Sequence, residues 1–155
     1  MPHVALWEPE IPPNTGNIAR LCAATGAALH LIGRLGFQLD DRSLLRAGLD
    51  YWSAVDIIRH ASLAEWEAWV ERQAPPPRIL CFSTRGDKLY TACAFQHDDV
   101  LLFGNESFGL PQEVLQQHAE RTFSVPMPTG KVRSLNLASA VGIVLYEALR
   151  QLHHW

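Results

Sequence analysis

The 155-residue chain has little of what builds a disulfide framework or a metal ribbon. It contains three cysteines, Cys22, Cys81 and Cys93, and no C-x-x-C motif. An odd number of cysteines without that spacing argues against a disulfide scaffold and against a zinc ribbon. Cys22 and Cys81 lie in apolar stretches, which predicts buried core thiols rather than nucleophiles.

Lysine is scarce as well, and the chain carries no excess of positive charge. The net charge is −3, which argues against a protein coated in positive charge for nucleic acid. Of the 13 cationic residues, however, 11 are arginine, and only Lys88 and Lys131 are lysine. Because arginine presents a planar fork of donors that suits phosphate and carboxylate, any anion-binding surface is expected to be local and rich in arginine.

No apolar run approaches the ~20 residues that cross a bilayer. The first residues, Met1 to His3, do not form a basic segment that leads into an apolar one. These two absences predict a cytoplasmic protein with no membrane partner. With 48% hydrophobic and 19% charged residues, the composition is that of a folded domain, and the length predicts a single domain over residues 1–155.

Short apolar segments alternate with helical ones along the chain. Asn14 and Gly26 are the expected caps of the first helix, and Ser62 to Glu65 form a capping box. The pattern predicts strands over 4–7, 28–32, 54–58, 79–83, 100–103 and 122–125, and helices over 15–25, 41–49, 62–73, from 111 and over 135–152. This alternation indicates an α/β fold, a mainly parallel sheet with helices on both faces.

The last helix is apolar around most of its circumference. One face carries Ala138, Val141, Leu145, Ala148, Leu149 and Leu152, and further apolar residues, Ile143, Val144 and Tyr146, lie outside it. Such a helix must be buried around most of its surface. It can lie deep in the core of its own chain or against a partner subunit, and the pattern by itself favours neither.

Three unusual segments follow strands, where ligands of parallel sheets bind. Residues 9–20 form a proline-rich loop that enters a helix, with Asn17 and Arg20 on one helical face. Residues 104–111 place Glu106 between two glycines, and residues 126–136 form a loop with two cations. Taken singly, each also fits an ordinary structure: a capped helix, a tight turn and a mobile loop. The middle segment matches no phosphate loop, dinucleotide fingerprint or nucleophile elbow.

Together, the three segments resemble one family. They read N-x-G-N-x-x-R over residues 14–20, F-G-N-E-x-x-G-L-P over 103–111, and V-P-M followed by S-L-N-L-x-x-A over 125–140. In this order they are similar to the SPOUT-class (trefoil-knotted) RNA ribose 2′-O-methyltransferases. Residues 8–26, the Gly33-x-x-Gly36-Phe37 turn and the segment from Arg46 to Tyr51 resemble the short branch that acts on wobble cytidine or uridine of tRNA.

The resemblance covers nearly the whole chain and carries expectations about fold and partners. It implies a parallel α/β sheet with a C-terminal trefoil knot, S-adenosylmethionine as methyl donor, and no metal. It also implies tRNA as the substrate and a homodimer packed through the last helix. Of the two alternatives for that helix, the resemblance thus favours packing against a partner subunit. Arg34 and the Ala138-Ser139 pair depart from the family pattern, in positions outside the residues that define the three motifs.

Site residues follow from the same resemblance. The implied catalytic set is Arg20, Asn17, Glu106, Ser134 and Asn136. The implied donor-binding set is Phe82, Thr84, Gly104, Glu106, Gly109, Val125, Met127, Ser134 and Leu135. Candidates for RNA binding are Arg46, Lys131, Arg133 and Tyr146.

The family assigns activation of the ribose hydroxyl to its motif arginine, here Arg20. Because the pKa of arginine is above about 12, Arg20 is a poor base. We therefore expect it to bind the adjacent phosphate and stabilise developing alkoxide charge, with the other catalytic residues orienting it and the substrate.

Three other readings compete with wobble methylation. One is a 2′-O-methyltransferase acting at another tRNA or rRNA nucleotide. Another is a non-catalytic RNA-binding module on the same scaffold, which would have no need of Arg20, Glu106, Ser134 and Asn136 together. The third is a flavodoxin-like nucleotide-binding domain, which leaves the three motifs unexplained.

Overall fold

A computed structural model describes residues 1–39, 42, 46 and 51–155. The helix expected over 41–49 lies almost wholly outside the described residues. The described part contains a seven-stranded sheet in the order β3-β2-β1-β6-β4-β7-β5. Every strand pair is parallel. The strands are β1 (His3–Trp7), β2 (Ala28–Ile32), β3 (Ile57–His60), β4 (Ile79–Phe82), β5 (Lys88–Leu89), β6 (Val100–Phe103) and β7 (Thr122–Ser124).

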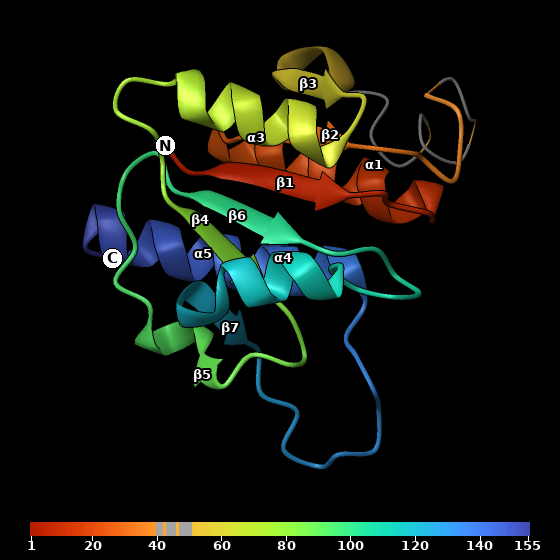
Figure 1. The fold of residues 1–155 in the computed structure, drawn as a ribbon. Coiled ribbons are helices and arrows are strands. Elements are labelled where there is room, and N and C mark those ends of the chain that lie inside the picture. Colours follow the sequence, from red (N-terminus) through yellow and green to blue (C-terminus); the bar gives the residue numbers. More distant parts are fainter. Residues whose placement is uncertain (40–41, 43–45, 47–50) are drawn as a thin grey trace.

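Helices of the described residues cover both faces of the sheet (Figure 1). On one face, α1 (Pro12–Thr25) and α5 (Leu137–His153) bury Ile18 and Leu145 against Val4 and Leu6. On the other, α3 (Leu63–Arg72) and α4 (Gln112–Gln117) bury Trp66 and Val114 against the sheet. The α/β layer arrangement predicted from the sequence is confirmed.

Because all strands run in one direction, their carboxyl ends lie along one edge of the sheet. In Figure 1 this is the edge toward which the strand arrows point. The loops that follow β1, β6 and β7 leave the sheet there, and they contain the three segments singled out in the sequence. Segments nearly 100 residues apart are thereby brought together.

The first helix begins earlier than expected. Pro12 and Pro13 occupy its first turn, where their missing N–H groups cost no hydrogen bond. Asn14 is therefore inside the helix, and the prediction that it caps the helix was wrong. Gly26 ends the helix with φ of 81°, and its N–H donates to the Cys22 carbonyl at 2.8 Å, as predicted.

Other helix ends follow their local signals closely. Ser62 Oγ accepts from the backbone N–H of Glu65 at 3.1 Å, and the Glu65 carboxylate accepts from Ala61, so the predicted capping box of α3 is confirmed. The last helix starts at Leu137 rather than 135, because Asn136 Oδ1 accepts from the backbone N–H of Ser139 and caps it.

Two strand predictions needed correction. The third strand begins at Ile57, since Trp52–Ala54 forms a 3₁₀ turn where a strand was expected to start. The two-residue strand β5 was not predicted, because Lys88 and Leu89 are exposed and too few to show an alternating pattern.

The last helix buries one face in its own chain and leaves part of its apolar surface exposed. Val141, Val144 and Leu145 are fully buried, while Ile143 and Tyr146 are 38% and 44% exposed. All three cysteines are buried core residues, and burial raises the pKa of the Cys22 thiol to about 12. Among the described residues, no helix is both long enough and apolar enough to traverse a bilayer.

Candidate functional site

A cleft of about 540 Å³ opens beyond the carboxyl ends of β4 and β6. Its walls are the turn over 104–110, the loop after β7 and the start of α5. All nine residues that the sequence predicted for donor binding line it: Phe82, Thr84, Gly104, Glu106, Gly109, Val125, Met127, Ser134 and Leu135. The structure thus gathers the predicted set in one cavity, and its binding role stays a prediction.

The turn from Gly104 to Gly109 folds back on itself along one wall of the cleft. A Cβ at Gly104 would lie 2.0 Å from the Gly109 carbonyl carbon, so only glycine fits there. The Gly109 N–H donates to the Asn105 carbonyl at 3.0 Å, and Asn105 Oδ1 accepts from the Phe108 N–H at 2.7 Å. These bonds hold the backbone of the turn while the Phe108 ring stays 80% exposed.

Two glutamates tie this turn to the loop before α1. Glu106 accepts the backbone N–H groups of Glu10, at 3.1 and 3.2 Å, and of Ile11, at 2.5 Å. Glu10 accepts the backbone N–H of Ser107 at 3.2 Å and its hydroxyl at 2.9 Å. We call these four residues the glutamate clasp. The Glu106 carboxylate is occupied by backbone donors of the loop before α1, and its orienting role in catalysis stays a prediction.

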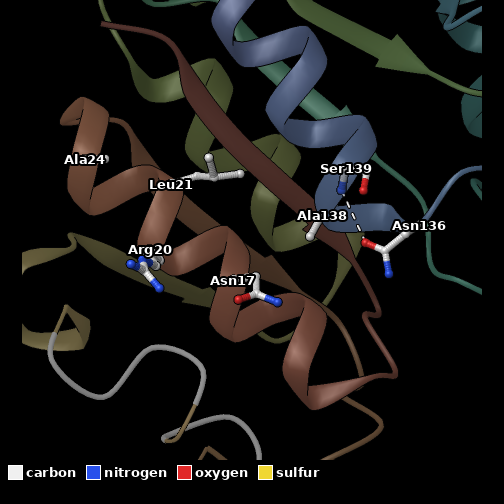
Figure 2. A pocket seen from close by; sticks show the side chains of 7 residues that line it. All are labelled: Asn17, Arg20, Leu21, Ala24, Asn136, Ala138 and Ser139. Carbon is white, nitrogen blue, oxygen red and sulfur yellow. Dashed lines mark hydrogen bonds between the residues drawn. The ribbon is translucent and has the colours of Figure 1, made fainter.

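A second cavity, of about 420 Å³, is an open groove between α1 and α5 (Figure 2). Figure 2 shows Asn17 and Arg20 projecting from α1, with Ser139 of α5 and its N-cap residue Asn136 at the other side. The prediction that Asn17 and Arg20 share a helical face is confirmed, since both line the groove, together with Ala24. Leu21 lines the groove as well and also packs against the core cluster.

The predicted catalytic residues are divided between the two cavities. Asn17 and Arg20 line the groove, Glu106 and Ser134 line the cleft, and Asn136 lines both. The Asn136 amide nitrogen donates to Asn14 Oδ1 at 2.9 Å, while its oxygen caps α5. This side chain therefore connects α1 to α5 where the two cavities meet.

The four candidates for RNA binding do not converge on one spot. Arg133 lines the cleft, and Lys131 is exposed in the same loop. Arg46 is exposed, and Tyr146 lies on α5 outside the lining of both cavities.

The model of the SpoU rRNA Methylase family matches residues 1–146 of this chain. The chain belongs to this family. A relative from Saccharophagus degradans named tRNA (cytidine(34)-2′-O)-methyltransferase is 46% identical over 151 residues, which cover 97% of this chain and 95% of that protein. This near-complete coverage means that the family resemblance includes both cavities.

Solved structures of SpoU methylases superpose closely on the chain. One, described as giving structural insights into the 2-OH methylation of C/U34 on tRNA, has a TM-score of 0.93 and 50% identity, covering 100% of this chain and 98% of that one. The SpoU methyltransferase AviRb from Streptomyces viridochromogenes, in complex with AdoMet, has a TM-score of 0.87 and 30% identity, covering 99% and 58%. These matches confirm the predicted SPOUT-class fold.

The cleft of this SpoU methylase fits S-adenosylmethionine in size and chemistry. Its volume lies within the ~300–1,000 Å³ typical of small-molecule sites. It combines apolar walls from Phe82, Phe103 and Leu135 with backbone polar groups of the glycine turn. The space beside the Gly109 Cα is open, with no described atom within 4 Å of where a Cβ would stand. Within the described ranges, no group of three or more His, Cys, Asp or Glu residues could hold a metal ion.

Several site residues were missed by the sequence reasoning. Ile11, Asn14, Arg85 and Phe108 line the cleft, and Glu10 completes the clasp. The glutamate partners are 96 residues apart, so no local pattern pairs them. Phe108 carries a usable signal, because a large apolar side chain between Ser107 and Gly109 in a turn is unusual.

Proposed function

We propose that this protein transfers a methyl group from S-adenosylmethionine to the ribose 2′-hydroxyl of nucleotide 34, the wobble cytidine or uridine, of tRNA. One observation carries the proposal: close identity over almost the full length of both chains to a relative with that name. The match to the structure concerned with C/U34 methylation supports the same substrate.

The donor belongs in the cleft at the strand ends. When bound, it supplies a methyl group on a positively charged sulfur atom. Backbone groups near Phe82 and Thr84 and along the turn from Gly104 to Gly109 would hold its polar parts, with Val125, Met127, Ser134 and Leu135 enclosing the rest. Backbone donors and acceptors at this position recognise an adenine without a charged side chain.

Arg20 is proposed to act on the ribose and its phosphate. The ribose oxygen would bond to the methyl carbon as the carbon–sulfur bond breaks, and the hydroxyl proton would pass to solvent. A guanidinium beside the oxygen stabilises the negative charge that develops on it. Arginine stays protonated at neutral pH, so Arg20 is assigned charge stabilisation rather than proton acceptance. Asn17, Ser134 and Asn136 are proposed to orient the substrate, and Glu106 to keep the clasp in place.

A homodimer packed through α5 completes the proposal. The exposed apolar side chains of Ile143 and Tyr146 support it, because an apolar helix surface is stabilised by a covering partner. A C-terminal trefoil knot, a single domain over 1–155, and action on tRNA in the cytoplasm belong to the same proposal. Arg46, Lys131, Arg133 and Tyr146 are proposed to contact the tRNA.

Transfer to defined tRNA transcripts tests the function. The protein is incubated with unmodified tRNA and S-adenosylmethionine carrying a labelled methyl group, and the labelled nucleotide is mapped. A matched transcript with a 2′-deoxyribose at position 34 is the control. Label at the ribose of nucleotide 34, absent from the control, is the expected result. Label at another nucleotide, or donor binding without transfer to any RNA, would overturn the proposal.

A further inference from the structure

The guanidinium of Arg20 lies over an aromatic ring from a distant part of the chain. Its Cζ atom is 5.0 Å from the centroid of the Tyr51 ring. This separation is within the ~6 Å over which a cation is attracted to the face of an aromatic ring. Among the described residues, Arg20 makes no ion pair and no side-chain hydrogen bond. Within the part of the chain that the structure describes, the Tyr51 ring is therefore the contact that restrains the end of this long side chain.

An aromatic partner restrains an arginine without using up its binding capacity. A carboxylate in the same place would neutralise the charge and occupy two of the five N–H donors. The face of a ring carries no opposite formal charge, so it attracts the guanidinium without neutralising it. Such an arrangement suits an arginine whose charge is directed at an incoming anion.

The position of Tyr51 is itself fixed by the fold. Its carbonyl accepts the backbone N–H of Ala54 at 2.9 Å, closing the 3₁₀ turn Trp52–Ala54. Trp52, the first residue of that turn, and Val55, the residue after it, pack against the core cluster that contains Ile18 of α1. Tyr51 is thus held next to α1 by packed neighbours, and its ring is only partly buried.

We propose that Tyr51 is a positioning residue for methyl transfer, which holds the Arg20 guanidinium over its ring and leaves the charge of Arg20 available for a ribose or phosphate oxygen. The expected effect on kcat rests on the proposed function. The contact between the Tyr51 ring and Arg20 rests on the geometry alone. It predicts that the aromatic ring of Tyr51 matters and that its hydroxyl does not.

Two apolar variants separate these predictions. Tyr51→Phe keeps the ring and removes the hydroxyl, while Tyr51→Leu removes the ring. We expect Tyr51→Leu to lower kcat by about 3- to 30-fold, the range that loss of a cation–π contact produces, with unchanged affinity for S-adenosylmethionine. Tyr51→Phe is expected to restore kcat to within about twofold of the parent. Equal losses in both variants, or full activity in Tyr51→Leu, would overturn the proposal.

A double-mutant cycle separates positioning from a general effect on folding. If Tyr51 acts through Arg20, Tyr51→Leu lowers kcat in the parent but has no further effect in an Arg20→Ala background. Additive losses would show that Tyr51 acts elsewhere. Thermal unfolding of each variant, measured alongside, shows whether the fold has been retained.

An NMR measurement tests the contact without any activity. Protons held over an aromatic face resonate upfield, so the Arg20 δ-methylene signal, assigned by its loss in Arg20→Lys, is expected upfield in the parent and in Tyr51→Phe only. An unchanged chemical shift of this signal in Tyr51→Leu would contradict the contact. The parent protein could show the upfield Arg20 signal and yet methylate no tRNA. That result would overturn the proposed function but would leave the contact between Tyr51 and Arg20 in place.

Discussion

The carboxylate of Glu106 lies 3.1 Å from the backbone nitrogen of Glu10 and accepts its N–H. The Glu10 carboxylate in turn accepts from the backbone N–H and the hydroxyl of Ser107, so each glutamate binds a residue next to the other. The clasp joins the turn of the cleft to the loop that starts α1, the helix carrying Arg20. Both cavities of the candidate site therefore depend on one pair of acidic side chains.

Replacing Glu106 by glutamine is expected to loosen the clasp. The amide retains one acceptor oxygen but places an NH₂ group opposite a backbone donor. Because a hydrogen bond to a charged group contributes about 1.5–3 kcal/mol, the free energy of unfolding is expected to fall by about that amount. Urea unfolding followed by circular dichroism measures it. Ser107→Ala, which removes only one neutral donor, is the milder control, and an unchanged midpoint for Glu106→Gln would contradict the stabilising role.

Arg20→Ala is expected to slow methyl transfer strongly while sparing the fold and donor binding. Loss of one preorganised donor at a developing oxyanion lowers kcat by about 100- to 1,000-fold. Turnover, affinity for S-adenosylmethionine by calorimetry, and thermal unfolding are measured on the same sample. Arg59→Ala, an exposed arginine on β3, is the matched control and should behave as the parent. Near-normal turnover by Arg20→Ala would exclude the role assigned to Arg20.

The sequence predicted the layers of the fold because local patterns determine them. The apolar run Val100–Phe103 forms a buried strand with the predicted bounds, and Gly26 ends its helix as its position indicates. Asn14 was misplaced because two local signals compete there. It is a good N-cap residue, but Pro12 and Pro13 favour an earlier start, and the structure follows the prolines.

The candidate site was predictable only in its parts. Parallel strands bring their carboxyl ends to one edge, so segments after strands could be expected to meet, and the predicted donor residues do share a cleft. The clasp, the Asn14–Asn136 hydrogen bond and the ring of Tyr51 over Arg20 could not be predicted. Each joins residues at least 30 positions apart, and no periodicity or spacing encodes such pairs.

Arg133→Ala is expected to weaken tRNA binding in a salt-dependent way. If Arg133 neutralises one phosphate, its removal lowers the slope of log affinity against log salt by about 0.7–0.9. Binding is measured with catalytically inactive Arg20→Ala protein over a range of salt concentrations. Arg72, exposed at the end of α3 on the opposite face of the sheet, supplies the control Arg72→Ala. Equal salt slopes for both variants and the parent would show that Arg133 does not contact the tRNA.

Ile143→Asp is expected to separate the proposed dimer. Ile143 is 38% exposed on α5, and a carboxylate buried there against a second copy would lack a partner charge. Sedimentation should give twice the 17.3 kDa chain mass for the parent and one chain mass for the variant. Trp155→Asp, the control, changes a side chain that is 66% exposed at the C-terminus. This variant is expected to sediment with the same mass as the parent. A variant that still sediments as the parent places the interface elsewhere.

Three histidines form a hydrogen-bonded row across the face of the sheet covered by α3. His30 Nε2 is 3.0 Å from His3 Nδ1, and His30 Nδ1 is 2.9 Å from His60 Nε2. Trp69 packs on all three rings, and His30 is fully buried. In each neighbouring pair one nitrogen must donate and the other accept, so the tautomers of the three rings are coupled along the row.

This row is expected to make the protein less stable as the pH falls. Burial, followed by repulsion from His3 and His60, lowers the pKa of His30 from 6.5 to about 3. Burial also lowers the pKa of His3, opposed by Asp98 and Asp56, and that of His60, opposed by Glu65 and reinforced by Arg72. Below pH 6.5 the unfolded chain binds protons that the folded chain does not, so the free energy of unfolding decreases.

His30 alone is expected to reduce the free energy of unfolding by about 2 kcal/mol between pH 7 and pH 5. The pKa of Glu147, lowered to about 2 by Arg150 and Gln151, takes effect only below its ordinary value of 4.5, outside this interval. Urea unfolding across the interval is compared for the parent and His30→Gln, whose amide keeps a donor and an acceptor but does not titrate. The variant is less stable throughout if it packs poorly, but its stability should depend less on pH. Parallel curves would mean that His30 is not the source of the acid sensitivity.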